Sequence, residues 1–227
     1  MTGFLDRADA GRQLANPLIA YGGRSDVVVL ALPRGGVPVG YEVARELHVP
    51  LDVFLVRKLG VPGHPELAMG AIAEGGVEVL SDDLIHDLGI PQKMVQEVAV
   101  RERMELDRRD ALYRGGRSLP VVRDRVVILV DDGLATGSTM QAAVMALRRM
   151  GPARIVVAVP VGVRETCERL GRLADEVVCL MAPEPFQAVG LWYAEFTQTT
   201  DDEAKQLLTP SRAETATSLL RHNADEA

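Results

Sequence analysis

Two adjacent acids, Asp131 and Asp132, are followed by a run of glycine and hydroxyl residues that could bind a phosphate. Glycine lets the backbone turn its N–H groups toward a ligand, and hydroxyl groups add further donors. The start of a helix would add a partial positive charge. Carboxylates beside such a loop are acceptors suited to the vicinal diol of ribose. These residue types therefore predict a sugar-phosphate site. Its members are Asp131, Asp132, Gly133, Ala135, Thr136, Gly137, Ser138 and Thr139.

The segments on either side of this loop predict a strand and a helix. Residues 126–130 are all apolar, as in a parallel strand that is buried on both faces. Met140, Ala143 and Leu147 have the spacing of a helix with one apolar face. The loop would then lie at the carboxyl end of a strand, where open α/β sheets bind ligands.

One alternative is a hydrophilic turn without a ligand. Another is the magnesium-binding strand of a Walker-type NTPase, but the sequence lacks the Gly-x-x-x-x-Gly-Lys-Ser/Thr loop of that class.

The stretch from Val127 to Met140 resembles the phosphoribosyl pyrophosphate (PRPP) signature of type I phosphoribosyltransferases. Its Ala-Thr-Gly-Ser-Thr-Met run is most similar to the adenine-type members, which carry Ala-Thr-Gly-Gly-Thr-Met. Ala135 stands where enzymes for 6-oxopurines have an Asp that contacts the base, so the sequence argues against hypoxanthine or guanine as the substrate. The resemblance implies that residues 131–139 bind the ribose 5-phosphate part of PRPP.

A second strand and loop support this interpretation. Residues 26–31 predict an apolar strand, which is followed by Leu32-Pro33-Arg34-Gly35-Gly36 and a helix. Two glycines permit close backbone approach, and an arginine offers a planar fork for phosphate oxygens, although alone this run would be more typical of a tight turn. In the family that it resembles, the loop wraps the pyrophosphate and often contains a non-proline cis peptide. Arg34, Gly35 and Gly36 receive that role by resemblance. The dinucleotide pattern Gly-x-Gly-x-x-Gly is absent, which disfavours a nicotinamide enzyme.

A third strand, predicted over residues 52–56, runs into the basic pair Arg57-Lys58. Type I phosphoribosyltransferases place a basic residue after this strand, facing the pyrophosphate. Lys58 is the first candidate and Arg57 the alternate, because neighbouring strand residues point to opposite faces. The alternative without a ligand is a solvated strand end.

The glycines and prolines between Gly60 and Glu66 suit a loop that changes shape between hinges. The resemblance implies that this mobile loop closes over the reaction. Residues 68–73 and 77–80 beyond it predict a hairpin. His64 and Glu66 lie on the loop, where each could transfer a proton in the closed state. Residues on such a loop are more commonly exposed and have no catalytic role.

The composition predicts one α/β domain over residues 1–227. The chain has 47% hydrophobic and 25% charged residues, which allows a sizeable core. A net charge of −7 and a pI near 5.2 argue against a nucleic-acid partner. No apolar run approaches the roughly 20 residues that span a bilayer, and the N-terminus lacks the pattern of a signal peptide. We therefore expect a cytoplasmic protein with no membrane partner. Cys167 and Cys179 are interpreted as reduced packing residues, because no His lies near them at ligand spacing.

The remaining segments complete the predicted fold. Residues 81–117 predict a helical insertion, in which Pro91 is the first residue of the long helix. The insertion either covers the active site or forms a subunit contact. Strands at 155–159 and 176–180, separated by a helix at 163–173, bring the mostly parallel sheet to about five core strands.

Residues 182–210, together with an N-terminal helix, correspond by resemblance to the hood that holds the acceptor. Residues 201–208 and 211–222 predict terminal helices. Aromatic residues are concentrated in the hood, in a chain that is only 4% aromatic. Phe186, Trp192 and Tyr193 either sandwich a planar acceptor or pack the hood against the core.

The chain is most similar to uncharacterised bacterial members of the family that share the loop Leu-Pro-Arg-Gly-Gly-Val-Pro-Val-Gly. The resemblance implies a homodimeric enzyme of nucleotide metabolism or purine salvage that transfers ribose 5-phosphate from PRPP to a nitrogenous acceptor, such as a nucleobase. The implied catalytic residues are Arg34, Lys58, Asp131 and Asp132. Mg²⁺ is the implied cofactor, and the two acids would reach it through ribose or water. The alternative is a sensor that binds PRPP or a nucleotide and transfers nothing.

Overall fold

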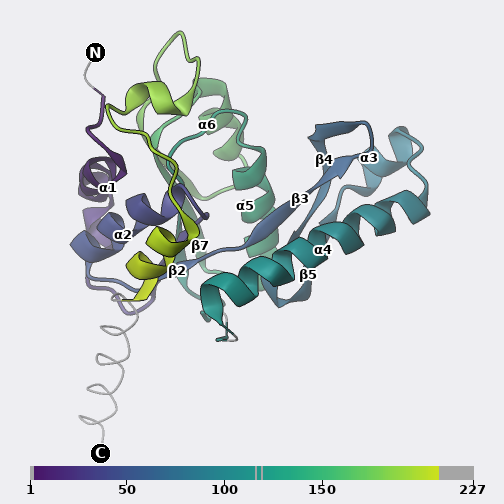
Figure 1. The fold of residues 1–227 in the computed structure, drawn as a ribbon, viewed down its shortest axis with the longest axis horizontal. Coiled ribbons are helices and arrows are strands. Elements are labelled where there is room, and N and C mark those ends of the chain that lie inside the picture. Colours follow the sequence, from purple (N-terminus) through teal and green to yellow (C-terminus); the bar gives the residue numbers. More distant parts are fainter. Residues whose placement is uncertain (1–2, 116, 119, 210–227) are drawn as a thin grey trace, which may run out of the picture.

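The computed structural model describes residues 3–115, 117–118 and 120–209, and its main element is a five-stranded parallel sheet (Figure 1). The strands lie in the order β2-β1-β6-β7-β8, and every neighbouring pair is parallel. They are β1 (Val27–Ala31), β2 (Leu51–Val53), β6 (Val126–Val130), β7 (Arg154–Val161) and β8 (Glu176–Met181). The predicted α/β fold with about five core strands is confirmed.

Helices cover both faces of this sheet. Val27, Val29 and Ala31 of β1 pack in one core with α1 (Arg7–Ala15) and α2 (Gly36–Leu47). Val28 and Leu30 pack in a second core with α5 (Ser138–Met150) and α6 (Arg164–Leu170). Successive strand residues face opposite sides, so a strand covered on both faces must be apolar throughout. The helix predicted over 163–173 ends earlier, at Leu170, because a turn begins at Gly171 and glycine is a poor helix former.

A second, antiparallel sheet projects from one side of the molecule (Figure 1). Its strands are β3 (Val56–Val61), β4 (His64–Ala73) and β5 (Val77–Leu80), with the short helix η2 (Glu74–Gly76) between the last two. Helices α3 (Asp82–Asp87) and α4 (Gln92–Arg114) follow, and α4 runs along this sheet (Figure 1). Pro91 precedes α4 and does not begin it, because its ψ of 138° is extended.

Two predictions for this region were wrong. The strand predicted over 52–56 divides, since β2 ends at Val53 and the chain enters the second sheet at Val56. The expected loop from Gly60 to Glu66 is the turn of the β3–β4 hairpin, with Gly63 at a φ of 82°. The pairing shifts register around Gly60, so its glycines and prolines form a bulge and a tight turn. The hairpin predicted beyond it is confirmed as β4–β5.

The N-terminal segment pairs with residues 192–195, which follow the last strand of the parallel sheet. The Phe4 N–H donates to the Trp192 carbonyl at 2.8 Å, and the Ala194 N–H donates to the Phe4 carbonyl at 2.9 Å. Short helices η1 (Asn16–Tyr21) and η3 (Val189–Trp192) belong to these two parts of the chain, and residues 201–209 are helical. The helix predicted over 211–222 lies outside the described residues.

None of the helices within the described residues is both long and apolar enough to cross a bilayer.

Candidate active site

The predicted ligand loops meet at one edge of the parallel sheet. Ala31 of β1 lies opposite Val130 of β6, so the loops after these strands leave the sheet side by side. The Leu32 N–H donates to the Val130 carbonyl at 2.9 Å, and a Cβ atom on Gly36 would lie 2.7 Å from the same oxygen. The glycine-rich loop therefore packs directly against the start of the acidic segment.

The loop over residues 32–36 has the backbone that the resemblance implied. Its peptide bond between Pro33 and Arg34 is cis. A Cβ atom on Gly35 would lie 2.2 Å from Oδ2 of Asp132, so only glycine fits between this loop and the acid. Arg34 lies near Tyr113 of α4: burial and the hydrogen bond to Asp201 raise the pKa of that phenol, and the charge of Arg34 opposes the rise.

The loop before α5 directs its carbonyl groups away from the predicted phosphate position. The Thr166 hydroxyl of α6 donates to the Ala135 carbonyl at 2.9 Å, and the Arg169 guanidinium donates to the Thr136 carbonyl at 2.7 Å. The Thr136 and Ser138 hydroxyl oxygens lie 3.1 Å apart. With two carbonyls bound to α6, the loop can offer a ligand these hydroxyls and the first N–H groups of α5.

Two glycines of the same loop leave no room for a side chain. A Cβ atom on Gly133 would lie 2.5 Å from Cγ1 of Val189. At Gly137 it would lie 2.4 Å from Cγ2 of Thr166, and the φ of 71° also favours glycine. Packing of the loop against α6 and the hood is thus a second reason for its composition.

The two acids form an electrostatically coupled pair. Burial raises the pKa of Asp131 well above its usual range, and the neighbouring charge of Asp132 raises it further. Burial also raises the pKa of Asp132, while Arg7 opposes that rise. The Asp132 N–H donates to Oδ1 of Asp131 at 2.9 Å, which orients the first carboxylate. The site therefore concentrates negative charge that a cation or hydrogen-bond donors can stabilise.

Arg7, at the start of α1, supplies such a cation. Its Nε and Nη2 atoms lie 2.9 and 2.8 Å from Oδ2 of Asp132. Its Nη1 donates to the Thr197 carbonyl at 2.6 Å, and the guanidinium stacks 3.9 Å from the centre of the Phe196 ring. The sequence analysis did not identify Arg7, and no local spacing could have done so, because 125 positions separate it from Asp132.

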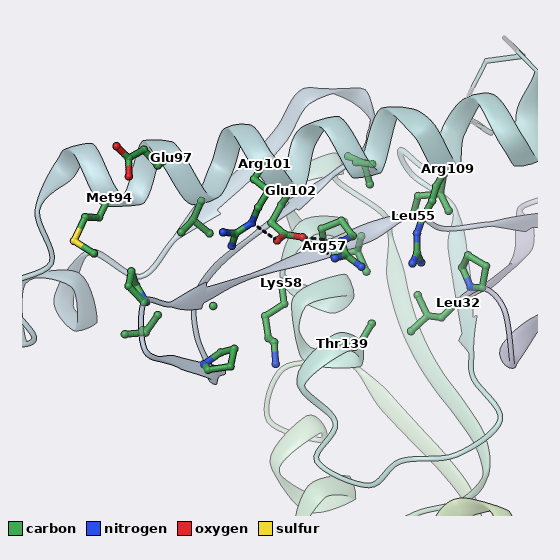
Figure 2. A pocket seen from close by; sticks show the side chains of 18 of the residues that line it. Leu32, Leu55, Arg57, Lys58, Met94, Glu97, Arg101, Glu102, Arg109 and Thr139 are labelled. Atoms are coloured by element: carbon green, nitrogen blue, oxygen red, sulfur yellow. Dashed lines mark hydrogen bonds and ion pairs between the residues drawn. The ribbon is translucent and has the colours of Figure 1, made fainter.

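Arg57 and Lys58 point to opposite sides of β3, as the strand geometry requires (Figure 2). Arg57 faces α4, where its Nη2 lies 2.7 Å from Oε2 of Glu102. Lys58 points away from α4, on the side where Thr139 lies in the first turn of α5 (Figure 2). Of the two basic residues, Lys58 is thus the one directed toward the phosphate loop.

A cavity of about 710 Å³ joins these segments (Figure 2). Pro33, Lys58 and Thr139, one from each of the three predicted ligand segments, all line it. Its opposite wall is α4, which contributes residues such as Val98 and Leu106. Helix α4, the main element of the predicted insertion, therefore forms one wall of this cavity.

Comparison with known proteins agrees with this geometry. The model of the phosphoribosyl transferase domain matches residues 4–191. The chain belongs to this family. Over 205 residues it is 49% identical to "Putative phosphoribosyl transferase Rv0571c" of Mycobacterium tuberculosis H37Rv, a match that covers 90% of the chain and 46% of that relative. The chain thus spans about half the length of the curated relatives it matches.

Solved structures show the same fold. The crystal structure of TT1426 from Thermus thermophilus is 45% identical and superimposes with a TM-score of 0.82, covering 91% of this chain and 97% of that one. The AQ2163 protein from Aquifex aeolicus is 10% identical with a TM-score of 0.50, over 89% of this chain and 85% of that one, and is similar in fold alone. The architecture is that of type I phosphoribosyltransferases.

In this phosphoribosyltransferase fold, the predicted aromatic residues of the hood are buried or partly buried in packing contacts. Tyr193 is 6% exposed, and its hydroxyl donates to the Asp132 carbonyl at 2.6 Å. Its ring lies 5.4 Å from that of Phe4 and 5.0 Å from that of Phe196. Phe186 and Trp192 are partly buried against the same cluster. Tyr193 therefore packs the hood against the core, and its role toward an acceptor stays a prediction.

Other predicted residues lie farther from the phosphoribosyltransferase loops. His64 is exposed at the start of β4, and the side chain of Glu66 lies outside the described part of the structure. Cys167 and Cys179 are free and half-buried, on α6 and β8. Both sulfur atoms approach Gly162, where a Cβ atom would lie 2.9 and 3.4 Å from them, so they contribute to packing as expected.

Proposed function

We propose that the protein transfers ribose 5-phosphate from PRPP to a nitrogen nucleophile and releases pyrophosphate. The observation that carries this proposal is the cavity that Pro33, Lys58 and Thr139 line, together with the close approach of the acidic pair to the loop that follows Pro33. A pyrophosphate, a ribose diol and a 5-phosphate need three different donor or acceptor sets, and these segments supply them along one sheet edge. Family membership supports the same reaction type.

The 5-phosphate would be bound by Gly133, Ala135, Thr136, Gly137, Ser138 and Thr139. Their N–H and hydroxyl groups meet the positive end of the α5 dipole, which favours a dianion. Asp131 and Asp132 would accept hydrogen bonds from the ribose hydroxyls. Arg34, Gly35, Gly36 and Lys58, with Arg57 as the alternate, would hold the pyrophosphate.

Magnesium fits the donor chemistry of this site. The described residues contain no group of three or more His, Cys, Asp or Glu side chains placed to hold a metal ion. Mg²⁺ commonly binds through one or two carboxylates together with substrate phosphates and waters, and the adjacent Asp131 and Asp132 offer such a pair. When bound with PRPP, Mg²⁺ would neutralise negative charge on the pyrophosphate. The chain's own residues would then orient PRPP for reaction.

Positive charge develops on carbon 1 of the ribose as pyrophosphate departs. The carboxylates of Asp131 and Asp132 would stabilise that charge, and Lys58 would stabilise the leaving group. Helix α4 and the β3–β4 hairpin wall the cavity and would limit the entry of water that hydrolyses PRPP. The hood over residues 182–210 would place the acceptor. Since Ala135 offers no carboxylate to a base, we propose an acceptor other than a 6-oxopurine.

We further propose a single domain over residues 1–227 that works in the cytoplasm as a homodimer. The half-buried thiols of Cys167 and Cys179 are compatible with a reducing compartment. These assignments rest on the family resemblance and stay predictions.

The deciding experiment measures pyrophosphate release from PRPP and Mg²⁺ with a panel of purine, pyrimidine and amine acceptors, together with PRPP affinity by calorimetry. Release that depends on an acceptor is the expected result. Tight PRPP binding with no release in any arm would instead establish the alternative, a PRPP sensor. Absence of PRPP binding would reject both functions.

A further inference from the structure

Two nitrogen atoms of Arg7 contact one oxygen of the Asp132 carboxylate. Both Nε and Nη2 approach the same carboxylate oxygen, Oδ2, at 2.9 and 2.8 Å. Arg7 thus binds a single oxygen of this carboxylate, and the remaining hydrogen-bonding capacity of the group is left to other partners. The two side chains are 11% and 17% exposed, so solvent screens the contact only weakly.

The guanidinium is itself held from two further directions. Nη1 donates to the Thr197 carbonyl at 2.6 Å, and the plane of the group lies over Phe196. Both residues belong to the hood, whereas Arg7 belongs to α1. A planar fork with several donors can satisfy these contacts together, and a lysine ammonium cannot. The position of Asp132 is therefore coupled to the packing of α1 against the hood.

The glycine-rich loop packs against the same carboxylate. Its Oδ2 atom approaches Gly35 so closely that a Cβ atom there would lie 2.2 Å away. Gly35 and Arg7 therefore both approach Oδ2, and rotation about the χ angles of Asp132 would break the contact with the guanidinium. A carboxylate fixed in this way can receive a ribose hydroxyl without first losing side-chain freedom.

We propose that Arg7 is a positioning residue of the PRPP site, which holds the Asp132 carboxylate in place through one oxygen so that it can accept hydrogen bonds from the ribose diol. This inference rests on the proposed function. Arg7 need not touch the substrate, because it acts through Asp132.

The test compares Arg7→Met, Arg7→Lys and a control, Arg12→Met, on the same helix. Arg12 is 45% exposed and has only long contacts, 3.9 Å to Asp9 and 3.8 Å to Glu42. The affinity for Mg²⁺ and PRPP is measured by calorimetry at one pH. Arg7→Met should lower the affinity by up to roughly tenfold, because the Asp132 side chain must then be ordered by the ligand. Arg7→Lys, which keeps the charge, should restore part of this loss, and Arg12→Met should match the wild type.

Two further measurements keep the result interpretable. In an Asp132→Asn background, Arg7→Met should have no further effect on affinity. Binding of inorganic pyrophosphate, which lacks the ribose, should be the same in Arg7→Met and in the wild type. An equal loss of PRPP affinity in the two backgrounds, or an equal loss of pyrophosphate binding, would overturn the role of Arg7 while leaving the proposed function intact. Failure of the wild type to bind PRPP would instead remove the proposed function, and the role of Arg7 with it.

Discussion

Arg114 and Glu74 form an ion pair from which solvent is almost fully excluded, with side chains that are 1% and 4% exposed. Arg114 ends α4, and its Nη2 donates to the Val53 carbonyl at 2.6 Å and to Oε1 of Glu74 at 2.8 Å. The same Glu74 oxygen accepts the Leu55 N–H at 3.0 Å. The pair thus attaches the insertion to the short segment between β2 and β3, which leads directly to Lys58.

Replacement of Arg114 by Met should destabilise the protein by about 3–5 kcal/mol, because it leaves a buried carboxylate and the Val53 carbonyl without their partner. Denaturant unfolding of the variant measures this loss. The control is Arg103→Met, since Arg103 is 51% exposed and pairs with Glu78 at the surface. It should cost at most about 1 kcal/mol. Equal losses of unfolding free energy in the two variants would show that the buried pair stabilises the protein no more than the surface pair does.

The same pair predicts how stability depends on pH. Burial raises the pKa of Glu74 from 4.5 to about 7, although Arg114 lowers it in part. Between these values the folded protein holds a proton that the unfolded chain releases, so stability is highest at the acid end and falls as the pH rises to 7. The loss is on the order of 3 kcal/mol, at about 1.4 kcal/mol for each pKa unit.

Unfolding curves at several pH values between about 5 and 8 measure this slope in the wild type and in Glu74→Gln. The unfolding free energy of Glu74→Gln should depend less on pH, because the glutamine side chain stays neutral throughout this range. Glu78→Gln, on the neighbouring strand β5, serves as the control and should keep the wild-type slope. A slope that survives in Glu74→Gln would assign the effect to other groups, such as the acidic pair at the end of β6.

The central parallel strands and their loops could be predicted because their signals are local. Residues 126–130 form one apolar run, and the loop after it contains the glycines that its geometry needs. Local patterns failed where the same residue types suit two structures. Gly60 and Gly63 are compatible with hinges of a mobile loop and equally with the bulge and turn of a hairpin, and cross-strand pairing with β4 decides between them.

The buried contacts could not be predicted for a different reason. Arg7 reaches Asp132 across 125 positions, and Arg114 reaches Glu74 across 40. An arginine near a chain end or at the end of a charged helix is typically solvated, and nothing beside it in the sequence indicates a distant carboxylate. Only the packing of α1 and α4 against the sheets brings these partners together.

Replacement of Gly137 by Val should abolish PRPP binding. The new side chain would enter the space of Thr166 and would need a φ that β-branched residues avoid, so the loop must move. Gly23→Val is a matched control, because Gly23 has a φ of 67° and no atom within 4 Å of the place that a Cβ atom would take. That variant has similar backbone strain but should bind PRPP as the wild type does. Calorimetry with PRPP and with ribose 5-phosphate measures both variants, and micromolar affinity retained in Gly137→Val would refute the assignment of this loop.

Replacement of Lys58 by Ala should reduce turnover more than it reduces PRPP affinity. Negative charge on the pyrophosphate increases as the bond to carbon 1 breaks, so a cation directed into the cavity contributes more in the transition state than in the ground state. Arg57→Ala is the matched control from the adjacent position: its guanidinium faces Glu102 of α4, so its loss should loosen α4 and affect both quantities through the cavity wall. Single-turnover rates and PRPP dissociation constants for the two variants separate these effects. If Lys58→Ala lowers affinity and rate in equal proportion, the lysine serves ligand capture alone, and the assigned role in stabilising the leaving group is wrong.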